Sequence, residues 1–194
     1  MVWFRTAGVF FSYNFLKKVL QYLYSKVGAD MFNKGDFVLN ATNGICEIID
    51  IVEMDMLGNS QVKKYFFLVP VNEKTAKVYI PVDNADARIR GIISKEQAGK
   101  LLDEISDIDE LVVSFEKERE LTYKNAIKSC EPRQLIGLIK CIYRRRAERL
   151  EQGKKCTAVD ERYYKNAENN LYSELAFVLG KDKKEIEQYI ISCL

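Results

Sequence analysis

The chain has 194 residues, which is enough for one domain or for two small ones. Its 30 basic and 28 acidic residues give a formal net charge of +2, so the chain as a whole is not a basic coat for nucleic acid. It has no histidine, which excludes histidine-based catalytic triads, histidine proton shuttles and metal sites that need imidazole. The 5 cysteines show no C-x-x-C spacing and predict free thiols in a reducing cytoplasm.

Residues 1–30 differ from the rest of the chain because they are rich in aromatic side chains. Lys17 and Lys18 interrupt the apolar run, so the segment matches neither a signal peptide nor a secure transmembrane span. Two interpretations remain open. The segment is an amphipathic interfacial helix, or it is an over-extended gene start, with translation beginning at Met31. The amphipathic face would contain Leu16, Leu20, Leu23 and Val27.

Residues 31–92 carry short runs of β-branched and aromatic residues separated by turn residues, of which Asn43-Gly44 is the strongest turn signal. These runs predict strands at 37–39, 45–54, 62–71 and 77–80. Four or five short strands in so short a segment favour a strongly bent barrel of the SH3 or Tudor type. Such a barrel often binds a partner by adding a strand to an exposed edge.

Residues 93–194 predict five amphipathic helices joined by short links. Each helix has a candidate start signal, and Gly153 and Gly180 are candidate stops. The predicted fold class is therefore α+β, a small Tudor/SH3-like β-barrel followed by a five-helix all-α domain. The start signals are Ser94 with Gln97, Ser114, Glu131-Pro132, Thr157 with Asp160, and Asp182.

The stretch 131–167 has the largest surplus of positive charge in the chain, whereas 96–120 is acidic. A solvated helix face and a phosphate-binding helical hairpin both explain the basic stretch. No phosphate-binding loop, dinucleotide fingerprint or convergent pair of carboxylates is present. We therefore expect no catalytic site, cofactor, metal site or small-molecule ligand.

Two sets of motifs, in a fixed order, resemble the CarD/CdnL family of bacterial transcription factors, whose N-terminal domain also occurs in transcription-repair coupling factor. The resemblance extends from Met31 to the C-terminus. The first set is Phe32-x-x-Gly35-Asp36-x-Val38, Asn43-Gly44, Tyr65 and Ile80-Pro81-Val82-x-Asn84-Ala85. The second set is Tyr123-Lys124, Leu138-x-x-x-Ile142-Tyr143-Arg144-Arg145 and Glu174-Leu175-Ala176.

The resemblance implies that the N-terminal domain, 31–92, binds the RNA polymerase β subunit, partly by strand addition. It implies that the helical domain, 93–194, contacts promoter DNA at the upstream edge of the transcription bubble and changes open-complex stability. A cytoplasmic, nucleoid-associated protein without membrane attachment is expected. The implied polymerase-binding residues are Ile51, Met54, Tyr65, Phe67 and Tyr79, and the implied DNA-binding residues are Arg119, Tyr123, Lys124, Arg144, Arg145, Lys155 and Lys165.

The sequence departs from the family pattern at three places. Arg119 stands where the family has a tryptophan that wedges into DNA, and the only tryptophan here is Trp3. Arg119 or Tyr123 inserts instead, or there is no wedge. Arg88-Ile89-Arg90 replaces a glycine-leucine-arginine string, and Met54 and Tyr79 stand where some relatives carry arginine. One rival hypothesis is a protein-interaction module that has lost DNA contact, and a more distant one is a membrane-tethered adaptor.

Overall fold

The computed structural model describes residues 3–6, 9–12, 32–55 and 61–194. Near the N-terminus, β1 (Trp3–Thr6) and β2 (Val9–Ser12) form an antiparallel pair. The expected amphipathic helix and the expected start at Met31 lie outside the described residues. Within these residues, no helix has the length and apolar character that a bilayer crossing requires.

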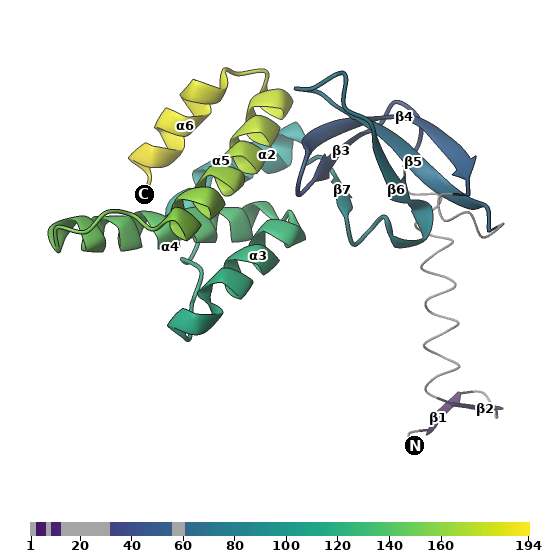
Figure 1. Ribbon diagram of the computed structural model, residues 1–194, viewed down its shortest axis with the longest axis horizontal. Coiled ribbons are helices and arrows are strands. Elements are labelled where there is room, and N and C mark those ends of the chain that lie inside the picture. Colours follow the sequence, from purple (N-terminus) through teal and green to yellow (C-terminus); the bar gives the residue numbers. More distant parts are fainter. Residues whose placement is uncertain (1–2, 7–8, 13–31, 56–60) are drawn as a thin grey trace.

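A five-stranded antiparallel sheet forms the first part of the fold, with strand order β6-β5-β4-β3-β7 (Figure 1). The sheet confirms a β domain, and in the described chain it has two edges, β6 and β7. The short strand β7 was not predicted. The bounds are β3 (Phe37–Asn40), β4 (Gly44–Met54), β5 (Lys63–Pro70), β6 (Val78–Pro81) and β7 (Ile89–Gly91).

One face of this sheet closes over its own small core. Cross-strand partners share a face, so Ile48, Leu68 and Val78 lie together on it, as do Phe66 and Ile80. Short segments outside the strands complete this core, including a 3-10 turn (Val82–Asn84). The fully enclosed residues are Phe32, Val38, Cys46, Ile48, Phe66, Leu68, Ile80, Val82, Ala85 and Ile89.

Five helices follow the sheet and lie beside it (Figure 1), which confirms the predicted α+β order. Ser94 and Gln97 form the predicted capping box, and the Asp160 amide donates to Thr157 Oγ1 at 3.1 Å. Gly180 ends the fourth helix in the left-handed conformation, as its position suggested. The bounds are α2 (Lys95–Asp103), α3 (Arg119–Ser129), α4 (Pro132–Glu151), α5 (Ala158–Leu179) and α6 (Lys183–Ser192).

The prediction that Ser114 caps the second helix is wrong. A 3-10 turn (Glu116–Glu118) precedes α3, and the cap position is Glu118, whose side chain makes no capping hydrogen bond. Residues 104–113 run along α4 instead, and the amide of Leu111 donates to the Gly137 carbonyl at 2.9 Å. The segment begins with a 3-10 turn (Ile105–Asp107), the contact of Leu111 with Gly137 then holds it against α4, and α3 begins only at Arg119.

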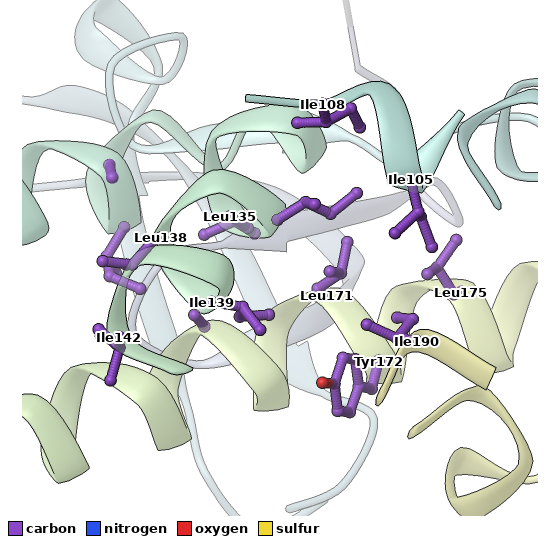
Figure 2. Close-up of a cluster of buried hydrophobic side chains, with 14 of the residues drawn as sticks. Ile105, Ile108, Leu135, Leu138, Ile139, Ile142, Leu171, Tyr172, Leu175 and Ile190 are labelled. Atoms are coloured by element: carbon purple, nitrogen blue, oxygen red, sulfur yellow. The ribbon is translucent and has the colours of Figure 1, made fainter. Parts of the chain in front are cut away.

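The helical core lies between α4 and α5, with α6 closing one side (Figure 2). Leu135, Leu138 and Ile142 of α4 face Leu171 and Leu175 of α5, and all are buried. These positions recur at three- and four-residue intervals, so each helix places them on one face.

An ion pair with a fully buried carboxylate joins the sheet to the helices. Arg90 of β7 donates to both carboxylate oxygens of Glu174 on α5, at 2.8 and 2.9 Å. The Glu174 side chain has no exposed surface, and it also accepts the Ile93 amide at 3.0 Å. Arg90 further donates to the Cys130 carbonyl at 2.6 and 3.0 Å. Burial alone would lower the Arg90 pKa, but the Glu174 carboxylate raises it, so the guanidinium stays charged.

We predict that Arg90→Ala lowers the free energy of unfolding by about 3–5 kcal/mol, because it leaves the Glu174 carboxylate buried without its cation. Urea unfolding followed by circular dichroism measures this change. As a control, Lys100→Ala removes the exposed Lys100–Glu96 pair and should cost less than about 1 kcal/mol. Equal, small effects of the two substitutions would contradict the assignment of Arg90 as the joint between the domains.

Candidate functional site

The face of the sheet opposite its core carries most of the residues expected to bind polymerase. The strand register places Val52, Tyr65 and Pro81 in one cross-strand row, and Phe67 and Tyr79 in the next. The rings of Phe67 and Tyr79 stack, with centroids 5.1 Å apart and an interplanar angle of 16°. Both side chains are half-exposed, so they form an aromatic surface next to the β6 edge.

The other three residues expected to bind polymerase differ in the face of the sheet on which they lie and in their exposure. Met54 pairs with Lys63 and lies on the aromatic face, half-buried. Ile51 points to the opposite face, beyond the sheet core, and is 40% exposed. Tyr65 is only 6% exposed, so its ring offers little contact area, and its role in polymerase binding stays a prediction.

One edge of the sheet, β6, pairs only with β5 in the described chain. Its outer backbone groups are therefore available to a further strand, which would lie beside the Phe67–Tyr79 stack. The two features together offer backbone hydrogen bonds and aromatic contact at one place.

The expected DNA-binding arginines of α4 contact the acidic part of the chain. Arg133, Gly137, Lys140 and Arg144 recur along one face of α4, and residues 104–118, which we call the acidic segment, run along that face. Arg133 pairs with Glu104, and Arg144 donates to Glu110 at 2.7 Å and also pairs with Glu148. Lys140 donates to the Ile108 carbonyl at 2.7 Å. Hydrogen bonds to Glu110 and Glu148 raise the Arg144 pKa above its usual range.

A second group of charges surrounds Asp160, which is 1% exposed. Arg145 Nε lies 3.3 Å and Arg119 Nε 3.5 Å from its carboxylate oxygens, and both arginines also pair with Glu116. Burial would lower the Arg145 pKa, but Glu116 and Asp160 raise it. The Arg119 side chain is only 13% exposed, so its insertion into DNA, one of the alternatives that the sequence leaves open, would require it to leave Glu116 and Asp160.

Comparison with known protein families identifies the sheet. Residues 32–93 match the family model described as the CarD-like/TRCF RID domain. The sheet is a CarD-like RNA polymerase-interacting domain. The chain is therefore a transcription-related protein that interacts with RNA polymerase. A search of curated proteins finds no significant match.

In the helical domain, which follows the CarD-like domain in the chain, Tyr123 of α3 is buried. Its side chain has no exposed area, its ring packs edge-on against Tyr163 at 5.7 Å, and its hydroxyl lies 3.9 Å from Cys141 Sγ. Burial raises its pKa above the usual range. Insertion of Tyr123 into DNA, one of the alternatives that the sequence leaves open, would require this ring to leave the helical core.

The lysines among the expected DNA-binding residues differ from the arginines. Lys124 lies on α3, Lys155 between α4 and α5, and Lys165 on α5; all three are exposed. In the described chain none of them forms an ion pair with a carboxylate. These charges are therefore free to meet an external phosphate.

Sequence reasoning missed an exposed stripe along α3. Leu121, Lys124 and Lys128 follow one another at intervals of three and four residues, which places them on one side of α3, and Lys117 precedes them in the 3-10 turn. Phe115 lies at the start of this stripe, is 61% exposed, and has the Lys117 ammonium 5.9 Å from its ring centroid. The helical spacing of the lysines was a signal in the sequence, whereas the exposure of Phe115 required the structure.

We predict that Gly137→Ala lowers the free energy of unfolding by about 1–3 kcal/mol, because a Cβ atom there would lie 2.9 Å from the Asp109 carbonyl oxygen. Helix propensity alone predicts the opposite sign, a gain of about 1 kcal/mol. Gly99→Ala in α2 is the matched control, since a Cβ there meets no atom within 4 Å and should stabilise the protein. Thermal or urea unfolding compares the two. A stabilising Gly137→Ala would rule out tight contact between the acidic segment and α4.

Proposed function

We propose that the protein is a transcription regulator without catalytic activity of its own. Its CarD-like domain binds the β subunit of RNA polymerase. Its helical domain contacts promoter DNA through phosphates, without reading a specific sequence, and this contact changes the stability of the open complex. The observation that carries the DNA part is the stripe of unpaired lysines along α3.

For polymerase binding, the supporting geometry is the free edge of β6 beside the Phe67–Tyr79 stack. Strand addition at an edge supplies affinity through backbone hydrogen bonds, and neighbouring side chains supply specificity. Half-exposed aromatic rings bury a large apolar area at little cost in conformational entropy, and such residues are frequent hot spots of interfaces. We assign the contact with the β subunit to this edge and face.

We predict that Phe67→Ala with Tyr79→Ala weakens binding to purified RNA polymerase by at least about tenfold, since hot-spot aromatics contribute about 2 kcal/mol or more. Surface plasmon resonance on immobilised polymerase measures the dissociation constant. Tyr189→Ala is the control, because Tyr189 is 44% exposed but lies on α6. Unchanged binding by the double variant, with its fold intact by circular dichroism, would remove this surface from the proposal.

For DNA contact, we assign the phosphates to Lys117, Lys124 and Lys128, with Lys155 and Lys165 as outer contacts. Lysine side chains that are exposed and unpaired exchange condensed counterions for phosphates without breaking an internal ion pair. Arg144 and Arg145 would first have to leave Glu110 and Glu116. We therefore assign those arginines to holding the acidic segment.

Phe115 is the residue we propose as the apolar wedge. It stands four positions before Arg119, just ahead of the 3-10 turn that precedes α3, and its ring is not enclosed by the core. Apolar side chains that enter a base step from the minor groove unstack it locally, and this unstacking costs free energy. A step at the edge of a transcription bubble is already unstacked, so inserting the side chain there costs less free energy. The lysines of the α3 stripe would hold the duplex beside it.

We predict that Lys124→Glu with Lys128→Glu lowers the salt dependence of the polymerase–promoter complex by about two units in the log–log slope, since each phosphate contact contributes about 0.9. Filter binding at several salt concentrations, with and without the protein, gives the slope. Lys95→Glu with Lys100→Glu reverses two exposed charges on α2 and is the matched control. An identical slope for the two double variants would contradict DNA contact along α3.

The rival is a polymerase-binding module that does not touch DNA. The neutralisation of Arg144 and Arg145 by carboxylates favours it, since those residues carry much of the positive charge of α4. The same filter-binding experiment separates the two functions. The rival predicts normal polymerase binding by every lysine and Phe115 variant and no effect of any of them on the promoter complex.

A further inference from the structure

A cavity of about 600 Å³ lies where the turn between β3 and β4 meets α3 and α5. Its size is within the range of small-molecule sites, which usually hold a ligand in a concave surface between structural units. Residues from four places line it: the 41–44 turn, Asn72 after β5, the exposed side of α3, and α5 with the first turn of α6. The polymerase-binding edge β6 does not contribute to it.

The cavity wall is strongly positive. Lys124 and Lys128 of α3 and Lys183 of α6 line it, and none of its lining residues carries a carboxylate. In the described chain these lysines form no ion pair, although Lys183 donates to Asn169 Oδ1 at 2.7 Å. A concave surface with charges of one sign concentrates the electrostatic potential and attracts anions.

Amide side chains provide most of the remaining polar lining. Asn43, Asn72, Asn166, Asn169 and Asn170 all border the cavity. Three of them have internal partners, since Asn43 Nδ2 donates to Asn40 Oδ1, Asn169 Oδ1 accepts from Lys183, and Asn170 Nδ2 donates to the Ala41 carbonyl. Their remaining donors and acceptors, with those of the other two amides, suit hydroxyl groups and the edges of nucleobases, while the charged groups suit phosphates. Inorganic phosphate alone would leave most of this volume and most of these amides unused.

The walls are held in place from both domains. Asn40 Oδ1 accepts the amides of Thr42 and Asn43 at 3.1 and 3.0 Å, which fixes the turn between β3 and β4. Asn170, which is 4% exposed, donates from Nδ2 to the Ala41 carbonyl at 3.1 Å and ties this turn to α5. The site is therefore formed before any ligand enters it, which lowers the entropic cost of binding.

We propose that this cavity binds a free nucleotide carrying two or more phosphates. The phosphates lie between Lys124, Lys128 and Lys183, and the asparagine amides contact the sugar and base. Duplex DNA, whose grooves alone are about 6 and 12 Å wide, is too large to enter the cavity and meets only its rim. This proposal goes beyond DNA contact and depends on neither DNA nor polymerase.

Isothermal titration calorimetry of the full chain, without polymerase or DNA, tests the proposal. The probes are the four ribonucleoside triphosphates, inorganic tripolyphosphate, and a single-stranded deoxynucleotide decamer. At least one triphosphate should saturate the protein with one site and bind more tightly than tripolyphosphate. Lys124→Gln with Lys128→Gln should weaken it by about tenfold or more, because two charge-assisted contacts are lost. Lys95→Gln with Lys100→Gln changes the same number of charges on α2 and should leave binding unchanged.

A second pair of substitutions tests the amides. Asn72→Ala with Asn166→Ala affects two exposed residues of the lining and should weaken the nucleotide but not tripolyphosphate. No saturable binding of any triphosphate, equal affinity for tripolyphosphate, or equal loss in the α2 control would overturn the proposal. Tighter binding of the decamer than of every triphosphate would also overturn it and would assign the cavity to a nucleic-acid strand. The filter-binding experiment on the polymerase–promoter complex tests DNA contact separately, whichever result the calorimetry gives.

Discussion

The relative position of the two domains depends on the contact of Arg90 with Glu174. A fully buried carboxylate is stable only when its charge and lone pairs are met, and Glu174 accepts from Arg90 and from the Ile93 amide. Arg90 also binds the carbonyl of Cys130, the only non-glycine residue with positive φ in the described chain. This bond helps to hold a backbone conformation that costs about 1–2 kcal/mol for an L-residue. One arginine thus connects β7, the α3–α4 junction and α5.

Ion pairs inside the helical domain determine which basic side chains remain available to bind a partner. The acidic segment lies along the face of α4 that carries Arg133, Lys140 and Arg144, and Gly137 lets its backbone approach the helix. The surplus of positive charge in 131–167 is therefore met largely by 104–118. In the described helical domain, lysines without such a partner lie elsewhere, among them Lys124 and Lys128 on α3. A charge count along the sequence locates the basic helix, whereas its ion pairs with the acidic segment are visible only in the structure.

Local signals in the sequence predicted most elements, and long-range contacts explain the errors. The Ser94–Gln97 box and the Thr157 cap involve residues three apart, so they could be recognised from the sequence. Ser114 failed as a cap because the preceding segment is held against α4 and α3 begins only at Arg119. The strand β7 has only three residues and is a strand because it pairs with β3. The burial of Tyr123 depends on its contacts with Tyr163 and Cys141. Each of these facts requires the tertiary structure, as does the exposure of Phe115.

The joint at Arg90 also couples the proposed surfaces. The β6 edge belongs to the sheet, whereas the lysines of α3 belong to the helices, so a fixed angle between domains fixes where α3 lies relative to bound polymerase. Three or four non-specific phosphate contacts are weak in free solution, but they become effective when polymerase binding keeps the helical domain close to one stretch of DNA. A rigid joint limits that search to a small volume. In the proposed function, specificity for promoters then resides in the polymerase, and the helical domain needs only unpaired lysines and an exposed ring at the correct distance.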